Sequence, residues 1–302
     1  MAARVIDVDM TGRTVVLTGA SSGIGAAAAL RLAGLGATVV PVGRSARRTA
    51  EVAARLGVEP IVADFGRLAE VRRLAETLLA RCPRIDILAN NAGALVSTRQ
   101  VTGDGHELTF QANHLAPFLL TNLLLPRLRE SARQAPVRIV TTSSLGNRFG
   151  RLRLDDLEWE RRRYGGGWIA YSTTKLMNVL FTRELARRTA AVDIDAVSFH
   201  PDPGRAGKRA GGTRPEATPT NFASGSRLAP LVARTPLRRI QLTGEQGAMP
   251  LVWLAAAPEV AGSSGAYYDG FHRDARVNPQ ADDPRLATQL WERSAELLRA
   301  YL

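Results

Sequence analysis

Tyr171 and Lys175 are the residues whose types and spacing point most directly to chemistry. They lie four residues apart in a helix-favouring stretch, so both side chains would lie on one helical face, about 5–6 Å apart at Cβ. A tyrosine with a pKa of ~10 is a poor acid–base catalyst at neutral pH, and a nearby ammonium favours its ionised form. The spacing is common by chance, but Lys175 is one of only two lysines among 40 basic residues. The pair therefore predicts proton transfer by a tyrosine.

A glycine-rich turn follows the first candidate strand. Residues 14–17 are a short β-branched run, and the alanine-rich residues 26–33 beyond the turn favour a helix. Small residues in such a turn let the backbone approach a pyrophosphate, whose charge is stabilised by the N–H groups and dipole of the helix. We predict a phosphate-binding turn formed by Gly19, Ser21, Ser22, Gly23, Ile24 and Gly25.

The end of the second candidate strand indicates which dinucleotide would bind there. Sites for NAD usually have an acidic residue at this position, whereas an arginine accommodates the 2′-phosphate of NADP. This chain has Arg44 and Ser45, with Arg47 and Arg48 close behind. Arg44 could hold a phosphate through two hydrogen bonds, and Ser45 could donate another. The alternative is that Arg44 is an ordinary surface arginine; we favour NADP(H) as the cofactor.

Strand-like runs alternate with helical stretches along the chain, which is typical of a parallel sheet with crossover helices. We predict an α/β fold with a Rossmann-type doubly wound parallel sheet of about seven strands, helices on both faces, and a single domain over residues 1–302. The expected strands are residues 14–17, 38–42, 60–63, 85–89, 137–142, 195–200 and 265–268. The expected helices are residues 26–33, 68–81, 107–129, 171–189, 245–256 and 284–302. Residues 203–227 are rich in Gly, Pro, Thr and Arg and are expected to form a flexible substrate lid.

Composition and charge exclude several other classes of protein. With 45% hydrophobic residues and one cysteine, the 302-residue chain is neither disordered nor stapled by disulfides. Its net charge of +12 could indicate a nucleic-acid partner, but the excess is almost all arginine, as a composition bias would produce, and no nucleic-acid-binding motif accompanies it. The four histidines have no metal-ligand spacing. We see neither a signal peptide nor the ~20-residue apolar run of a membrane span, and we expect a cytoplasmic protein.

The chain resembles the short-chain dehydrogenase/reductase family, whose motifs occur here in the family's order. The turn at residues 18–25 is similar to the family's cofactor turn, Asp64 and Phe65 to its adenine-binding pair, and Asn90-Asn91-Ala92-Gly93 to its signature after the fourth strand. The resemblance implies cofactor contacts by Asn91, Ala92 and Gly93. It also implies a catalytic tetrad of Asn113, Ser144, Tyr171 and Lys175.

This resemblance implies hydride transfer between a nicotinamide and a ketone, aldehyde or secondary alcohol, with an apolar small molecule as the expected substrate. Tyr171 would be the general acid or base, and Ser144 would hydrogen-bond the carbonyl oxygen. Lys175 would lower the pKa of Tyr171 and, like Tyr171, contact the cofactor, and Asn113 would hold a water that links Lys175 to solvent. Relatives often form dimers or tetramers, so we expect a homodimer or homotetramer.

A closer resemblance is to the retinol-dehydrogenase-like branch, carried by residues 113–121, 154–157, 175–185 and 290–294. That branch normally reads His-Pro-Gly after the sixth strand, followed by a Thr or Ser that contacts the nicotinamide amide. Here the sequence is His200-Pro201-Asp202-Pro203-Gly204. Either Asp202 replaces the glycine and damages that contact, or residues 204–217 are an insertion and Thr220 supplies the hydroxyl. We favour the insertion, which makes Pro203 and Thr220 candidate cofactor contacts.

Two functions remain open from the sequence. The leading hypothesis is an NADP(H)-dependent oxidoreductase with Tyr171 as its acid–base group. The alternative is a catalytically impaired NADP(H)-binding sensor or interaction protein, which the altered segment after His200 suggests. The presence of Ser144, Tyr171 and Lys175 together favours the enzyme.

Overall fold

A single eight-stranded sheet organises the computed structural model, which describes residues 7–202 and 244–302. Pro203, Thr220 and the expected lid at residues 203–227 lie outside the described residues. The strand order is β3-β2-β1-β4-β5-β6-β7-β8, and every neighbouring pair is parallel except β7 with β8. The strands are β1 Thr14–Thr18, β2 Thr38–Gly43, β3 Ile61–Val62, β4 Ile87–Asn90, β5 Val137–Thr142, β6 Ile194–His200, β7 Tyr267–Asp269 and β8 His272–Arg273. The predicted doubly wound α/β sheet is confirmed, with β8 as a short addition that the pattern did not predict.

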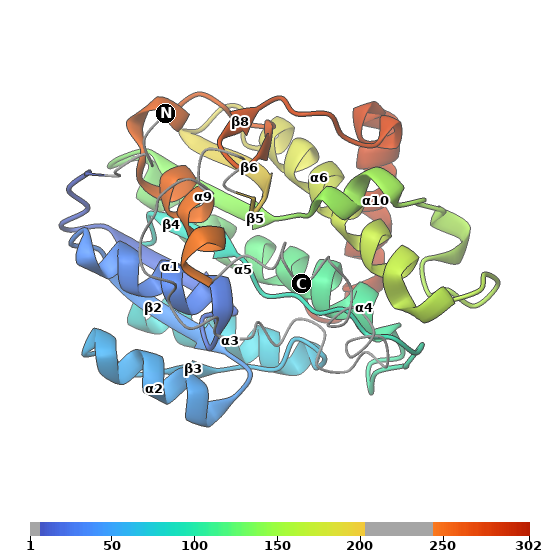
Figure 1. Ribbon diagram of the computed structural model, residues 1–302, viewed down its shortest axis with the longest axis horizontal. Helices are drawn as coiled ribbons and strands as arrows, with labels where there is room; N and C mark the ends of the chain where they lie inside the picture. The colour runs from blue at the N-terminus through green and yellow to red at the C-terminus, as the bar shows by residue number, and fades with distance from the viewer. Residues whose placement is uncertain (1–6, 203–243) are drawn as a thin grey trace.

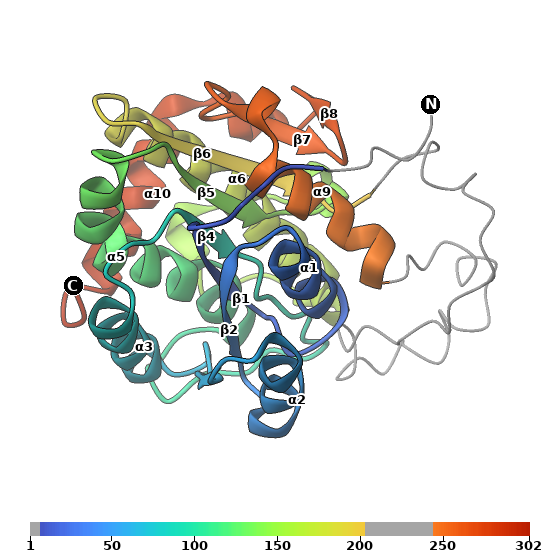
Figure 2. The ribbon, with the colours of Figure 1, turned by 90° about the vertical axis from the view of Figure 1, so that its left-hand side faces the viewer.

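Helices cover both faces of this sheet (Figures 1 and 2). Figure 2 shows α1 and α9 on one side of the sheet and α3, α5 and α10 on the other. The α-helices are α1 Gly23–Gly34, α2 Ala46–Leu56, α3 Leu68–Arg81, α4 Leu108–Phe110, α5 Ala116–Ala132, α6 Trp168–Arg188, α9 Gly244–Ala256 and α10 Pro284–Leu297. The 3-10 helix η2, Leu145–Phe149, comes between β5 and α6.

The two hydrophobic cores follow from the alternation of side chains along each strand. In β1, Val15 and Leu17 pack with α1 and α9, whereas Val16 between them packs with α3 and α5. In β4, Ile87 and Leu88 are divided between the two cores in the same way. Successive Cβ atoms of a strand point to opposite faces, so a strand buried on both faces must be apolar throughout.

Two segments differ from the expected elements. Helix α2 was not among the predicted helices, because its sequence is dominated by arginine and alanine and buries only Thr49, Val52 and Ala53. The helix expected at residues 107–129 is divided by a π-helical turn, Gln111–Leu115, between α4 and α5. Such π-turns occur frequently at functional sites, and this one carries Asn113.

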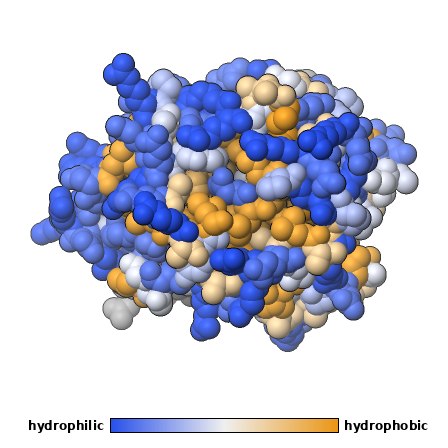
Figure 3. Space-filling view, turned by 180° about the vertical axis from the view of Figure 1, so that it is seen from behind, coloured by the Kyte–Doolittle hydropathy of each residue, from blue (hydrophilic) through white to orange (hydrophobic). Residues whose placement is uncertain are grey.

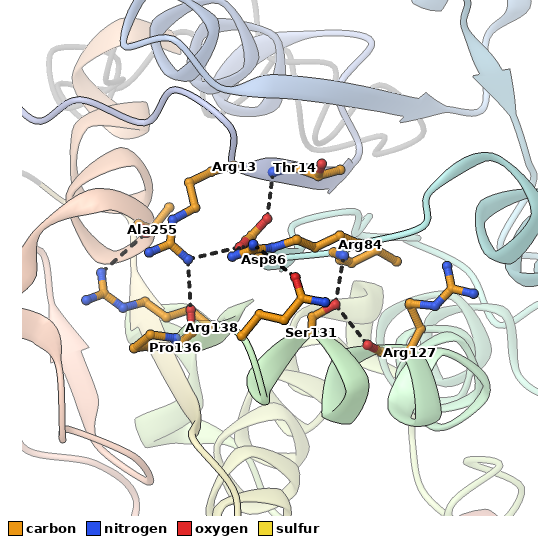
Figure 4. A network of polar contacts seen from close by, with 11 residues as sticks. Arg13, Thr14, Arg84, Asp86, Arg127, Ser131, Pro136, Arg138 and Ala255 are labelled. Atoms are coloured by element: carbon orange, nitrogen blue, oxygen red, sulfur yellow. Dashed lines mark hydrogen bonds and ion pairs between the residues drawn. The ribbon is translucent and has the colours of Figure 1, made fainter.

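Part of the arginine excess serves a buried network beneath the amino ends of the strands (Figure 4). The fully buried carboxylate of Asp86 accepts hydrogen bonds from the Arg13 guanidinium at 2.9 Å, from Arg84 Nε at 2.8 Å and from Thr14 N at 2.9 Å. Nearby, Arg138 Nη1 donates to the carbonyl oxygens of Leu254 and Ala255. These carbonyls close α9, where the helix dipole favours a cation.

We expect Asp86→Ala to lower the free energy of unfolding by about 1–3 kcal/mol, because Thr14 N and two guanidinium groups lose their acceptor. The loss stays below that of a fully buried ion pair, since the Arg13 and Arg84 side chains are 34% and 30% exposed. Urea denaturation measures the change. Glu296→Ala, which breaks an exposed pair with Arg293, is the control and should cost less than about 1 kcal/mol. Equal losses in the two variants would contradict the prediction.

Hydrophilic residues cover much of the face seen in Figure 3, around a hollow in which hydrophobic residues are visible. Several surface arginines pair with acids in the same helix, among them Arg47 with Glu51 and Arg72 with Glu76. Part of the positive charge is therefore balanced locally. None of the helices in the described part of the chain is long and apolar enough to cross a membrane.

Candidate active site

A cavity of about 440 Å³ opens at the carboxyl ends of the central strands, beside the point where the strand order reverses between β1 and β4. This is where ligands bind in doubly wound folds. The cavity brings together most of the residues predicted from the sequence: Gly19, Ser21, Ser22, Gly23, Ile24, Gly25, Arg44, Asp64, Phe65, Asn91, Ala92, Gly93, Ser144, Tyr171 and Lys175. Ser45 and Asn113 do not line it, and Pro203 and Thr220 lie outside the described residues.

Two glycines of the turn, Gly19 and Gly25, lie so close to neighbouring atoms that a side chain would not fit. Gly19 has φ +70°, and an added Cβ would lie 2.9 Å from Ala92 Cα, against the segment after β4. At Gly25 an added Cβ would lie 2.2 Å from Gly19 O, so a side chain there would push the first turn of α1 away from the loop. The backbone of the turn and the start of α1 therefore form a surface that a pyrophosphate could approach closely.

Thr18 joins this turn to the segment after β4, although the sequence did not single it out as a site residue. Its Oγ1 donates to Ala89 O at 3.2 Å and accepts hydrogen bonds from the N–H groups of Asn91 and Ala92. Asn91 Nδ2 in turn donates to Thr18 O at 3.0 Å. These bonds fix the position of the glycine turn relative to the segment after β4, and both segments line the cavity. The β-branched type alone could not have indicated this role, since it depends on which strand lies beside β1.

The structure places the four residues at positions 44, 45, 47 and 48 in different surroundings. Gly43 is so close to Ser21 that an added Cβ would lie 2.7 Å from Ser21 Cβ, which puts the end of β2 against the glycine turn. The next residue, Arg44, is exposed and lines the cavity together with Arg48. Arg47 instead pairs with Glu51 at 2.5 Å on the outside of α2. Two cations, Arg44 and Arg48, therefore border the cavity where an adenosine ribose would be expected.

Ser45 caps α2, because its Oγ accepts from Arg48 N at 3.4 Å. Its expected hydrogen bond to a phosphate stays a prediction. Asp64 and Phe65 both line the cavity, and Asp64 Oδ1 accepts from Gly66 N at 2.9 Å. That bond closes the turn after β3 and fixes the orientation of the carboxylate.

Ser144, Tyr171 and Lys175 lie at the other end of the cavity. Tyr171, in the first turn of α6, is 4% exposed, and the Ser144 side chain acts to lower the pKa of its hydroxyl. Ser144 Oγ also accepts from Gly146 N at 3.1 Å, which orients the hydroxyl. Lys175 Nζ donates to Thr142 O at 3.0 Å and lies 5.5 Å from the centroid of the Tyr171 ring. The predicted neighbours on one helical face are therefore also neighbours in space.

The pKa shifts at this end of the cavity are dominated by burial. Burial raises the pKa of Tyr171, although its hydrogen bond with Ser144 acts in the opposite direction. Burial also lowers the pKa of Lys175 to about 8, since a dry environment disfavours the ammonium. We expected Lys175 to lower the pKa of Tyr171, but in the protein without bound ligands the pKa of Tyr171 is raised. The Lys175 amine donates to the Thr142 carbonyl, and burial is the largest influence on the pKa of Tyr171.

The side chain of Asn113 is buried between the segment after β4 and α6. Its Oδ1 accepts from Ala94 N at 2.8 Å, and its Nδ2 donates to Ala94 O at 2.9 Å and to Thr174 Oγ1 at 3.1 Å. Gly93 separates Asn113 from Lys175: an added Cβ there would lie 3.2 Å from Lys175 Nζ and 3.3 Å from Asn113 Oδ1. Asn113 thus fixes the segment after β4 against α6, and its expected bridging water stays a prediction.

His200 and Pro201 also line the cavity, so the first part of the altered segment reaches the site. Within the described residues the buried Nδ1 of His200 has no hydrogen-bond partner. Burial lowers the pKa of this histidine, against the influence of the Asp269 and Asp202 carboxylates. In residues 7–202 and 244–302, no group of three or more His, Cys, Asp or Glu could hold a metal ion.

A doubly wound sheet with a glycine turn, a Ser–Tyr–Lys group and an asparagine in the preceding π-turn matches the architecture that the motifs implied. The family model described as short chain dehydrogenase matches residues 13–154. A protein of Streptomyces sp. (strain C5), whose name provisionally assigns it as the daunorubicin C-13 ketoreductase DnrU, is 42% identical over 295 residues, covering 95% of this chain and 92% of that protein. This chain belongs to the short-chain dehydrogenase/reductase family.

Two further comparisons refine this assignment. Human retinol dehydrogenase 13 is 36% identical, over 95% of this chain and 85% of its own length, which confirms the resemblance to retinol dehydrogenases. The NADP active-site complex of Pseudomonas aeruginosa RhlG has the same fold, with a TM-score of 0.64 and 26% identity over 87% of this chain and 98% of its own. Solved structures with this fold include complexes with NADP and with NADH. This short-chain dehydrogenase/reductase is therefore an oxidoreductase of a family whose members bind nicotinamide cofactors.

Proposed function

We propose that this family member is an NADP(H)-dependent oxidoreductase that reduces a ketone or aldehyde, or oxidises the corresponding secondary alcohol. The observation that carries the proposal is the grouping of Ser144, Tyr171 and Lys175, the last two one helical turn apart, in the same cavity as the glycine turn. Such a cavity can place a hydride donor and a proton donor on the same carbonyl. The similarity to a protein named for a ketoreductase supports ketone reduction.

The residues present fit a nicotinamide dinucleotide. Gly19 and Gly25 let the turn pack closely against the segment after β4 and the start of α1, so that backbone lines this part of the cavity, and Asp64 and Phe65 line the region where an adenine would lie. The cations Arg44 and Arg48 favour a cofactor with a 2′-phosphate, since guanidinium groups bind phosphate through charge-assisted hydrogen bonds. When bound, the reduced nicotinamide supplies the hydride.

The chain's own groups would supply the proton and hold the oxygen. Ser144 Oγ donates a hydrogen bond to the substrate carbonyl, which polarises it and fixes its position beside the Tyr171 hydroxyl. Tyr171 Oη gives its proton to the oxygen as charge develops there, and accepts that proton in the oxidation direction. Lys175 stabilises the tyrosinate that remains, provided that its ammonium is charged.

The test of this proposal is the loss of NADPH absorbance in the presence of a panel of apolar ketones and aldehydes. We expect turnover with at least one member of the panel, and none when the carbonyl compound is left out. Tight NADPH binding without turnover of any compound would support the alternative, an NADP(H)-binding sensor. The expected cytoplasmic location and homo-oligomeric state stay predictions, which fractionation and light scattering would test.

The titration of Lys175 predicts how cofactor binding depends on pH. Because burial lowers its pKa to about 8, the ammonium is charged below that pH and neutral above it. An ammonium that contacts the cofactor stabilises the complex only while charged, so we expect the Kd for NADPH to rise about tenfold between pH 7 and pH 9.5. NADPH fluorescence measures this change. Lys175→Met should bind NADPH more weakly and show little of the rise; a flat profile for the unmodified protein would contradict the prediction.

A further inference from the structure

Exposed apolar side chains gather around the Ser144–Tyr171 pair. Of the eight large hydrophobic side chains that are exposed in the described residues, four belong to two short segments beside this pair. Leu145 and Phe149 begin and end η2, directly after Ser144, and are 37% and 63% exposed. Trp168 and Ile169 begin α6, directly before Tyr171, and are 48% and 38% exposed. We name these four side chains the apolar rim.

The two segments of the apolar rim are packed against each other. An added Cβ on Gly146 would lie 3.2 Å from Ser172 Oγ and 3.7 Å from Tyr171 Cε1. An added Cβ on Gly150, which follows η2, would lie 2.6 Å from Ser172 O. The 3-10 helix therefore runs along the first turn of α6. The four rim side chains do not line the cavity themselves, but they adjoin Ser144 and Tyr171, which do.

Trp168 differs from every other tryptophan of the chain. Trp159, Trp253 and Trp291 are at most 8% exposed, whereas nearly half of the Trp168 side chain is exposed. Its ring centroid lies 5.9 Å from that of Tyr171, with 31° between the planes. Part of the indole thus contacts the ring of the proposed acid–base group, and the remainder is open to solvent. Exposure of so large an apolar surface beside a reacting group gives the fold no stability.

The backbone before Trp168 is specialised to place it there. Gly165, Gly166 and Gly167 all have positive φ, between 59° and 79°, which glycine adopts without strain. An added Cβ on Gly167 would lie 1.8 Å from Val96 O, so this turn is pressed against the segment after β4. Just before the turn, the Tyr164 hydroxyl donates to Glu107 Oε1 at 2.9 Å. These two contacts fix the turn that precedes Trp168, and so hold the indole next to Tyr171.

We propose that Trp168 is a specificity-determining residue that stacks on a flat, aromatic ring system conjugated to the reacting carbonyl. The proposal rests on the function proposed above, because it assumes that the carbonyl oxygen lies at the Tyr171 and Ser144 hydroxyls. The indole lies beside the Tyr171 ring, with 5.9 Å between the centroids, so an aryl group attached to a carbonyl held at the Tyr171 hydroxyl would lie near it. Aromatic pairs are favourable at centroid distances of ~4.5–7 Å. A branched aliphatic group at the same place would contact the rim without stacking.

The test compares two ketones that share a methyl carbonyl, 2-acetylnaphthalene and cyclohexyl methyl ketone. We expect Trp168→Ala to raise KM for 2-acetylnaphthalene about three- to tenfold with kcat nearly unchanged, and to alter KM for cyclohexyl methyl ketone less than twofold. Trp168→Phe should restore most of the lost affinity because it keeps an aromatic ring. Ile169→Ala removes a neighbouring rim side chain without removing an aromatic ring, and should affect the two ketones equally.

Calorimetric titration of 2-acetylnaphthalene into the enzyme saturated with NADP⁺ separates this proposal from the proposed function, because it needs no turnover. If no compound of the panel, these two ketones included, is reduced but 2-acetylnaphthalene binds more weakly to Trp168→Ala, the proposed reaction is wrong and the stacking role of Trp168 stands. If Trp168→Ala lowered the affinity for both ketones equally, with NADP⁺ binding unchanged, the proposed stacking role of Trp168 would be overturned. No binding of 2-acetylnaphthalene to the unmodified complex would also overturn it.

Discussion

Tyr171→Phe is expected to lower kcat roughly 10²–10⁴-fold, the usual contribution of a positioned general acid. The substitution removes a single oxygen and leaves the buried ring and its contact with Trp168 in place. The Kd for NADPH should therefore stay within about twofold of the unmodified value. Steady-state kinetics and NADPH fluorescence together measure the two quantities.

Tyr301→Phe is a matched control for this substitution. It also removes one tyrosine hydroxyl, which donates to Asp104 at 2.9 Å near the end of the chain and does not line the cavity. Its kcat should remain within about twofold of the unmodified value, as for most surface changes. An active Tyr171→Phe protein would show that Tyr171 is not the proton donor. The proposed cofactor site would not be affected by that result.

Arg44→Ala is expected to raise the Kd for NADPH about 10–100-fold while changing the Kd for NADH less than about threefold. The guanidinium lies at the end of β2, beside the glycine turn, where only a cofactor with a 2′-phosphate would receive a charge-assisted hydrogen bond from it. Loss of such a bond costs roughly 1.5–3 kcal/mol, which corresponds to this range. Titrations with both dinucleotides measure the selectivity directly.

The neighbouring arginines supply the controls. Arg48 also lines the cavity, so Arg48→Ala should lower NADPH affinity more than NADH affinity, as Arg44→Ala does. Arg47 points away to Glu51, so Arg47→Ala removes the same charge from the same helix and should change neither Kd by more than about twofold. If Arg44→Ala weakened NADPH and NADH equally, the arginine would serve the fold and not the choice of cofactor.

Much of the site could be predicted because it consists of short segments whose roles are local. The strand at residues 14–17, the glycines behind it and the helix that follows form one continuous unit, and the structure places that unit at the cavity. The four-residue spacing of Tyr171 and Lys175 likewise specifies a common helical face before any tertiary contact is known. Order, spacing and side-chain type were sufficient here because they act within one or two turns of backbone.

Other features depend on segments that meet only in the folded chain. The choice of Arg48 over Arg47 follows from which face of α2 turns toward the cavity, and the apolar rim exists because η2 lies along α6. Dehydration is also a collective effect: many side chains must enclose Tyr171 before its pKa rises, and a short motif contains no information about that enclosure. The linear chain thus specified the proposed reacting groups and their order, whereas packing set their pKa values, their hydrogen-bond partners and the position of the indole beside them.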